Sequence, residues 1–331
     1  MSYAPYQTEF EFALQAVQQA ARLARQIQVE LAPPALEKAD RSPVTVADFS
    51  VQAVLSRRLA QAFPADPLIA EETSQALQAQ EGAHTLAQVC GYVSRLIPEA
   101  DPTRVCAWID RGQAKSASRF WTCDPIDGTK GFLRGGQYVV ALALVEAGQV
   151  QVGVLGCPHL TDPTQPELDG AGSLILAMRG RGAFLTSLAE PGELTALHVS
   201  ACRAPAQARL VRSYAAEHTN VQLVDRLAAA LGSVVPPLRL DSQAKYALVA
   251  AGAAELMLRV LPSGKPDYRE NIWDIAAGAL IVQEAGGQVT DLDGQALDFS
   301  RGRKLSCNRG VLASNGALHA EALRALEACG A

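Results

Sequence analysis

The chain has 331 residues, of which 49% are hydrophobic and 19% are charged, and its net charge is −5 at pH 7. This composition excludes wholesale disorder, and the length favours one large or two moderate lobes. Net negative charge disfavours binding to a nucleic acid polymer or an anionic membrane, so an anionic ligand would need a local basic pocket. No apolar run approaches the roughly 20 residues of a membrane span, and residues 1–10 lack the features of a signal peptide. We therefore expect a cytoplasmic protein, and the seven cysteines, which are scattered without C-x-x-C spacing, are expected to be reduced.

The first half of the chain predicts helices followed by an antiparallel sheet. Apolar residues from Phe10 to Ile27 recur at the interval of one helix face. Apolar, β-branched runs further on are joined by Gly-containing turns, which is typical of neighbouring antiparallel strands. The expected segments are a helix at 8–29, a helix after Thr45, a strand at 68–70, helices within 74–118, and strands at 119–123, 138–146, 150–157 and 173–179.

The second half alternates strands with helices from about residue 210 onward. Gly286-Gly287 is a typical helix stop, because glycine readily adopts the left-handed conformation that ends a helix. The expected segments are helices at 221–231, from 243, at 273–285 and at 317–328, and strands at 238–240, 255–261 and 310–313. We therefore expect an N-terminal lobe over residues 1–210 and a smaller α/β lobe over residues 211–331.

Two carboxylates and a hydroxyl lie within six residues in the run Asp124-Pro125-Ile126-Asp127-Gly128-Thr129. The run follows a strand, Pro125 disfavours a continued ladder, and Gly128 permits a tight turn. Hard cations such as Mg²⁺ take oxygen ligands, so both aspartates can ligate while the amides of Gly128 and Thr129 face a phosphate. The alternative is an Asp-rich turn that is capped by its own side chains.

Three further acids, Asp48, Glu71 and Asp274, stand at the ends of expected elements. Two magnesium ions that catalyse phosphoryl transfer need three to five carboxylates, and this set supplies them. Each acid also has a structural explanation. Asp48 forms a T-x-x-D capping pattern with Thr45, Glu71 ends a strand, and Asp274 suits the dipole of a helix N-terminus.

Three motifs resemble the inositol-monophosphatase superfamily of lithium-sensitive, magnesium-dependent phosphatases. They are Glu71-Glu72 after a strand, the run from Asp124 to Thr129, and Trp273-Asp274-Ile275-Ala276-Ala277-Gly278. Within that superfamily the chain is most similar to the 3′(2′),5′-bisphosphate nucleotidases, which remove the 3′-phosphate of adenosine 3′,5′-bisphosphate. The runs that resemble this branch are residues 42–48, 128–134, 156–158 and 240–246.

The resemblance implies a layered αβαβα sandwich, of α/β (α+β) class, with two or three Mg²⁺ ions. It also implies a small nucleotide bisphosphate as substrate, with its sulfated relative as a second substrate. The implied metal ligands are Glu71, Asp124, Asp127, Asp274 and the carbonyl of Ile126. Asp48 and Thr129 would position and deprotonate the attacking water. The implied substrate contacts are Gly128, Thr129, His218, Ser242, Lys245, Arg259 and Asp274.

Two alternatives stay open at this point. One is another phosphatase of the same superfamily that acts on an inositol or sugar phosphate, and the other is a catalytically inactive nucleotide-binding sensor. The chain also departs from the branch in two places. Arg134-Gly135-Gly136 lacks the acid that usually follows Arg-Gly, and the loop over residues 158–172 matches poorly.

Overall fold

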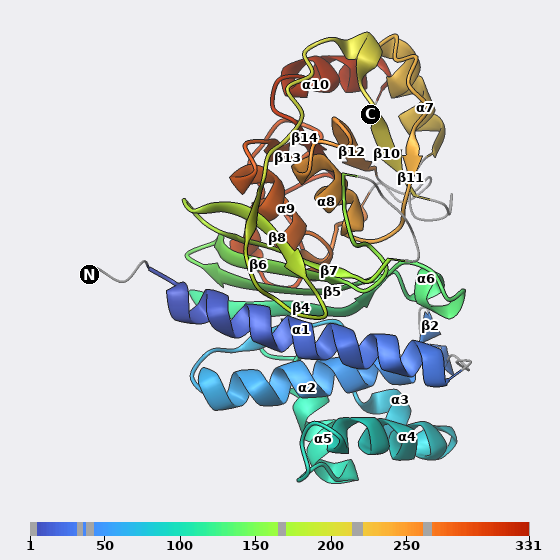
Figure 1. Cartoon of the computed structure of the whole chain (residues 1–331), viewed down its shortest axis with the longest axis vertical. Helices are drawn as coiled ribbons and strands as arrows, with labels where there is room; N and C mark the ends of the chain where they lie inside the picture. The colour runs from blue at the N-terminus through green and yellow to red at the C-terminus, as the bar shows by residue number, and fades with distance from the viewer. Residues whose placement is uncertain are drawn as a thin grey trace.

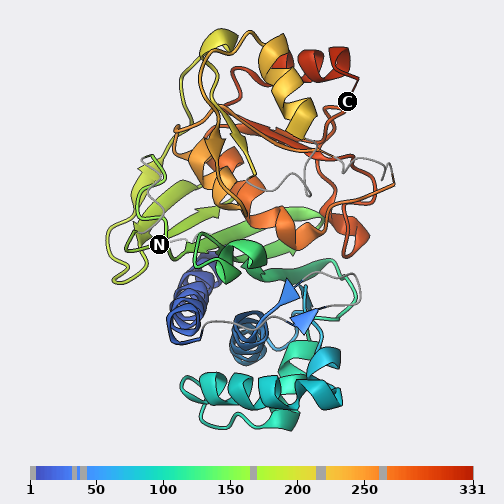
Figure 2. The same ribbon diagram turned by 90° about the vertical axis from the view of Figure 1, so that its right-hand side faces the viewer.

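Five layers of helices and sheets are stacked along the long axis of the molecule (Figure 1). The computed structural model describes residues 5–31, 36–37, 43–164, 170–213, 221–260 and 267–330. In order, the layers are helices α1 (Gln7–Glu30) and α2 (Val46–Ala62), a seven-stranded sheet, helices α8 (Ala244–Ala250) and α9 (Ala276–Glu284), a five-stranded sheet, and helices α7 (Val221–Ala230) and α10 (His319–Ala328). The helices between residues 75 and 110 lie beyond α2, outside the first layer. Figure 2 shows the same stacking from the side. This is the predicted αβαβα sandwich. None of the described helices is both long and apolar enough to cross a membrane.

The elements keep the labels of Figure 1. The helices are α1 (Gln7–Glu30), α2 (Val46–Ala62), α3 (Gln75–Gln78), α4 (Ala83–Ser94), α5 (Pro102–Asp110), α6 (Thr129–Leu133), α7 (Val221–Ala230), α8 (Ala244–Ala250), α9 (Ala276–Glu284) and α10 (His319–Ala328), with 3-10 turns η1 (Gln80–Gly82), η2 (Pro205–Gln207), η4 (Ile272–Asp274) and η5 (Phe299–Arg301). The strands are β1 (Leu36–Glu37), β2 (Pro43–Val44), β3 (Leu68–Ala70), β4 (Arg119–Asp127), β5 (Val139–Glu146), β6 (Gln149–Cys157), β7 (Ser173–Met178), β8 (Gly182–Ser187), β9 (Thr195–Leu197), β10 (Leu210–Arg212), β11 (Leu238–Arg239), β12 (Leu256–Arg259), β13 (Gln288–Thr290) and β14 (Val311–Ser314).

The larger sheet has the order β3-β4-β5-β6-β7-β8-β9. Its strands are antiparallel except for β3, which pairs in parallel with β4. The expectation that β4 ends at Cys123 is wrong, because the strand continues to Asp127. A β-bulge between Asp124 and Asp127 accommodates Pro125, whose missing N–H would otherwise interrupt the ladder.

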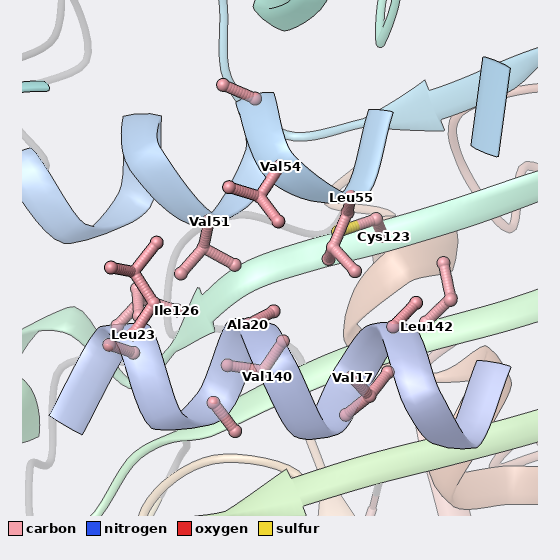
Figure 3. Packing of buried hydrophobic residues seen from close by; sticks show 14 of the residues in the cluster. Val17, Ala20, Leu23, Val51, Val54, Leu55, Cys123, Ile126, Val140 and Leu142 are labelled. Atoms are coloured by element: carbon pink, nitrogen blue, oxygen red, sulfur yellow. The ribbon is translucent and has the colours of Figure 1, made fainter. Parts of the chain in front are cut away.

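Helices α1 and α2 cover one face of the larger sheet with apolar side chains. In Figure 3, Val17 and Leu23 of α1 and Val54 of α2 pack against the strands that carry Cys123, Ile126, Val140 and Leu142. All of these side chains are 3% exposed or less, so they contribute to a continuous core. Burying one such side chain contributes roughly 1.5–3 kcal/mol. Strand β4, which carries both aspartates of the central motif, is thus held rigidly from this side.

Helices α8 and α9 fill the layer between the two sheets, where small residues permit close approach. A Cβ atom on Gly153 of β6 would lie 2.9 Å from the carbonyl oxygen of Ala277 in α9. A Cβ atom on Gly278 would lie only 2.5 Å from the ring of Tyr246 in α8. The small residues that follow Asp274 therefore let α9 sit directly against β6 and α8, which fixes where the chain enters that helix.

The smaller sheet has the order β11-β10-β12-β14-β13 and is covered on its outer face by α7 and α10. His319, at the start of α10, is 2% exposed and bridges two hydroxyls. Its Nε2 lies 2.9 Å from Oγ1 of Thr290, and its Nδ1 lies 2.8 Å from Oγ of Ser314. Burial lowers the pKa of His319 to about 4, because the charged ring would lose its hydration. The neutral ring thus joins α10 to β13 and β14.

Most expected elements are confirmed to within a few residues. The helix expected over residues 273–285 is divided, because η4 precedes α9 and Asp274 belongs to η4. Strands β8, β9, β10 and β13 were not expected, since they are short and their apolar alternation is weak. The lobe boundary near residue 210 stays a prediction.

Candidate active site

The bulge in β4 explains how Asp124 and Asp127 come to act together. Residues three apart on a regular strand point to opposite faces of the sheet. Here Asp124 is opposite Ala141 and Asp127 is opposite Val139, so the step of three residues on β4 matches a step of two on β5. The one extra residue returns Asp127 to the face of Asp124. Proline in the motif therefore marks a bulge that converts an odd spacing into a shared site.

Asp124, Asp127 and Asp274 each offer a carboxylate oxygen within 4.8 Å of the other two. Asp124 is 2% exposed and Asp127 is 8% exposed, so water screens their charges poorly. Burial, and then the charge of Asp274, raise the pKa of Asp127, while burial also raises the pKa of Asp274. Two buried carboxylates and the partly exposed Asp274 repel one another at this separation, and a divalent cation with oxygen ligands relieves that repulsion. The donor set therefore fits Mg²⁺.

Glu71 adjoins this cluster without belonging to its tightest part. It follows β3, whose last residue, Ala70, is level with Cys123 on β4, so Glu71 is level with Asp124. Its side chain is partly exposed, and its negative charge contributes to the raised pKa of Asp274. The buried amide of Gln52 in α2 fixes this strand end by donating to the carbonyl of Glu72 at 2.8 Å and accepting from its N–H at 2.9 Å.

Asp48 caps α2 and also faces Thr129. Its Oδ2 accepts hydrogen bonds from the N–H of Thr45 at 2.8 Å and from the hydroxyl of Thr45 at 2.6 Å, which completes the capping box of α2. Its Oδ1 lies 3.5 Å from Oγ1 of Thr129. The cap thus holds one oxygen and leaves the other directed at Thr129. The hydroxyl of Thr129 also lies 3.2 Å from the carbonyl oxygen of Ile126, which stands in the bulge.

The turn after β4 abuts the chain that enters α8. Gly128 has φ of 98°, a conformation that favours glycine, and Thr129 begins α6. A Cβ atom on Gly128 would lie 3.3 Å from Cβ of Ser242. Ser242 is 7% exposed and has φ of 65°, which is uncommon for a residue other than glycine. This conformation brings Ser242 beside the turn, in agreement with a role at the site.

The second half of the chain supplies two cations near the carboxylates. Lys245 is 4% exposed, and its Nζ donates to Oγ of Ser213 at 2.7 Å. Burial, and then the charge of Arg259, lower the pKa of Lys245 to about 8. Arg259 lies 2.8 Å from a carboxylate oxygen of Glu270 and 3.7 Å from one of Asp274. His218, the remaining predicted substrate contact, lies outside the described residues.

Gln243 is a residue at the site that the sequence interpretation missed. It is fully buried, and its backbone N–H donates to Oδ2 of Asp127 at 2.7 Å. Its side-chain amide donates to the carbonyl of Trp273 at 2.9 Å and accepts from the N–H of Gly278 at 3.1 Å. Gln243 therefore connects the segments of Asp127 and Asp274. It lies inside the run Leu240 to Tyr246, but only the three-dimensional contacts distinguish it from its neighbours.

Arg134, at the point where the chain departs from the bisphosphate nucleotidase pattern, contacts the same loop. Its guanidinium lies 3.1 Å from Oδ2 of Asp241, next to Ser242. The pair is largely solvent-exposed on the arginine side, so its contribution to stability is small. It joins the end of α6 to the chain that leads into α8.

Comparison with known proteins identifies the family of this chain. The inositol monophosphatase family matches residues 5–331. A 3′(2′),5′-bisphosphate nucleotidase of Emericella nidulans is 39% identical over 349 residues, which cover 97% of this chain and 98% of that protein. Among solved structures, an IMPase of Thermotoga maritima has a TM-score of 0.69 at 22% identity, with 98% of each chain covered. An IMPase/NADP phosphatase complexed with Mg²⁺ and phosphate has a TM-score of 0.65 at 21% identity, covering 98% of this chain and 97% of that one. The family resemblance of the motifs is thus confirmed, and this chain belongs to the inositol monophosphatase family.

Proposed function

We propose that this chain is a Mg²⁺-dependent phosphatase that hydrolyses the 3′-phosphate of adenosine 3′,5′-bisphosphate to give AMP and phosphate. The observation that carries the proposal is the group of three clustered carboxylates, Asp124, Asp127 and the partly exposed Asp274, beside the buried Lys245 and the partly exposed Arg259. A magnesium site alone suits many phosphatases. The cations Lys245 and Arg259 beside this site favour a substrate with a second phosphate. The bisphosphate nucleotidase at 39% identity over nearly the whole chain supports the same substrate class.

Asp124, Asp127 and Asp274 would hold Mg²⁺, with Glu71 and the carbonyl of Ile126 completing the ligands for two or three ions. When bound, Mg²⁺ supplies Lewis-acid stabilisation of the negative charge that develops during phosphoryl transfer. Accepting the proton of the attacking water and binding the substrate are left to residues of the chain. We assign these roles to the Asp48–Thr129 pair, to the turn at Gly128, and to the residues around α8.

The Asp48–Thr129 pair is suited to accept a proton from the attacking water. Oδ1 of Asp48 lies 3.5 Å from the hydroxyl of Thr129, which is loose for a resting hydrogen bond and shortens readily when a water is bound. The capping contacts to Thr45 keep the carboxylate in one rotamer, so no entropy is lost in orienting it during the reaction. A water held by this pair would attack the phosphorus in line with the departing 3′-oxygen.

Ser242, Lys245 and Arg259 would contact the substrate together with the Gly128–Thr129 turn, and His218 joins this proposed set. Lys245 lies in α8 and Arg259 ends β12, whereas Asp48 lies in α2 on the other side of the larger sheet, and the second phosphate would be bound by these two cations. A charge-assisted hydrogen bond contributes roughly 1.5–3 kcal/mol. Two of them would favour a bisphosphate over a monophosphate by about 10²–10⁴-fold.

The test is phosphate release from four substrates with Mg²⁺ and with EDTA. The panel contains adenosine 3′,5′-bisphosphate, its 5′-phosphosulfate relative, adenosine 3′-monophosphate and inositol 1-phosphate. We expect the bisphosphate to have the highest kcat/KM and EDTA to abolish turnover. A preference for inositol 1-phosphate would instead assign the chain to that substrate, which the IMPase structural relatives make the second candidate. Nucleotide binding without any Mg²⁺-dependent turnover would indicate a sensor.

A further inference from the structure

Arg303 joins the two segments that carry the outermost acids of the site. Its Nη2 donates to the carbonyl of Ala70 at 2.6 Å, and Ala70 immediately precedes Glu71. Its guanidinium carbon also lies 4.6 Å from the ring centroid of Trp273, which immediately precedes Asp274. The two acids are about 200 residues apart in the chain, so covalent connection does little to fix their separation.

Further hydrogen bonds tie Arg303 to both of these segments, so it does not behave as a cation on the surface. Its Nη1 donates to the carbonyl of Gly112 at 3.1 Å, and this same carbonyl accepts the N–H of Ala70 at 2.8 Å. On the other side, the backbone carbonyl of Arg303 accepts the N–H of Ile272 at 3.0 Å. Burial lowers the pKa of Arg303, and the carboxylate of Glu71 opposes that shift. Arg303 thus spans from the edge of the larger sheet to η4.

We propose that Arg303 is a positioning residue that sets the separation of Glu71 from Asp274 and thereby the affinity of the site for Mg²⁺. The guanidinium fork suits this role, because two of its nitrogens reach two carbonyls while its flat face covers the indole. A lysine has the charge without the fork or the face. The inference rests on the proposed function only in that the carboxylates bind Mg²⁺.

The direction in which Mg²⁺ affinity changes when Arg303 is replaced distinguishes a positioning role from a purely electrostatic one. A positive charge near the site repels Mg²⁺, so its removal without any structural consequence would strengthen binding. Loss of a positioning contact would weaken binding, because the carboxylates no longer hold the spacing that the octahedral geometry of Mg²⁺ demands. Arg303→Met removes both the charge and the contacts, whereas Arg303→Lys keeps the charge and loses most contacts.

The experiment is calorimetric titration of each full-length variant with MgCl₂, without substrate. Arg301→Met is the matched control, because the Arg301 side chain is 61% exposed and forms an exposed ion pair with Asp298, three residues earlier. We expect about tenfold weaker Mg²⁺ binding for Arg303→Met and for Arg303→Lys, and wild-type binding for Arg301→Met. Circular dichroism checks that each variant is folded. If Arg303→Met does not fold, the Mg²⁺ affinity of Arg303→Lys is compared with that of the wild type instead.

Unchanged or tighter Mg²⁺ binding by Arg303→Met would overturn the inference, and so would wild-type binding by Arg303→Lys. A weakening as large in Arg301→Met would also overturn it, because the effect would then belong to the loop as a whole. A wild-type protein that binds no Mg²⁺ would contradict the proposed function itself. By contrast, a wild type that binds Mg²⁺ and prefers another phosphate ester would alter only the substrate, and the comparison of variants would still decide the role of Arg303.

Discussion

Replacing Lys245 with Met should separate binding of the second phosphate from catalysis. Lys245 is 4% exposed, its ammonium donates to Ser213 at 2.7 Å, and Met fills a similar volume without a charge. A lost charge-assisted hydrogen bond costs roughly 1.5–3 kcal/mol. The KM for adenosine 3′,5′-bisphosphate should therefore rise about 10- to 100-fold, while kcat changes little.

Adenosine 3′-monophosphate is the reference substrate for this variant, because it lacks the second phosphate. Its kcat/KM should be nearly unchanged by Lys245→Met. Since the pKa of Lys245 is lowered to about 8, the ammonium of the free enzyme loses its proton as the pH rises above 8. Wild-type preference for the bisphosphate should fall over that pH range, and the variant should show no such fall. Steady-state kinetics from pH 7 to 9.5 provide both comparisons. Equal losses on both substrates, or a fall in kcat at constant KM, would refute this reasoning.

Three other changes test the ligands, the packing and the buried histidine. Asp124→Asn should lower turnover at least about 100-fold and weaken Mg²⁺ binding, while its circular dichroism spectrum stays that of the wild type. Near-normal turnover of this variant would exclude a ligand role for Asp124. Gly278→Ala should lower the unfolding free energy by about 1–3 kcal/mol in denaturant titration, because its Cβ would meet the ring of Tyr246 at 2.5 Å. Gly91→Ala in α4 is its control, since that Cβ would meet nothing within 4 Å, and an equal loss there would contradict the packing argument. Because the pKa of His319 is lowered to about 4, the neutral ring stabilises the fold fully above pH 6.5. Up to about 3 kcal/mol of unfolding free energy is lost as the pH falls toward 4. The His319→Gln variant should therefore show a flatter pH dependence of stability between these pH values. Parallel curves for the wild type and this variant would be inconsistent with a neutral buried ring.

Local patterns made the helices and the long strands predictable from sequence. Helical spacing identified α1, and Thr45 with Asp48 identified the start of α2, because both signals depend on neighbouring residues. The Gly-containing turns between strands were also expected, including the Gly-Arg-Gly turn at residues 180–182. Its contacts were not, since its three N–H groups donate to the carboxylate of Glu284, about a hundred residues away. Such a contact has no local signature.

The candidate site shows the same division between local and distant information. The run from Asp124 to Thr129 indicated a site, but strand periodicity places Asp124 and Asp127 on opposite faces, and only the bulge resolves this. Pro125 was interpreted as a strand end because proline usually has that effect. Gln243 and Arg303 escaped notice because their importance lies in contacts with Trp273 and with the end of β3, which no spacing in the sequence encodes.

The most direct test of the central claim is the identity of the product formed from adenosine 3′,5′-bisphosphate, followed by ³¹P NMR with Mg²⁺ and with EDTA. Because Mg²⁺ held by Asp124, Asp127 and Asp274 would bind the 3′-phosphate and the two cations would bind the 5′-phosphate, we predict adenosine 5′-monophosphate and inorganic phosphate with Mg²⁺, and no reaction with EDTA. Release of the 5′-phosphate, leaving adenosine 3′-monophosphate, would reverse the assigned orientation. Phosphate release at the same rate in EDTA would contradict a metal-dependent site at Asp124, Asp127 and Asp274.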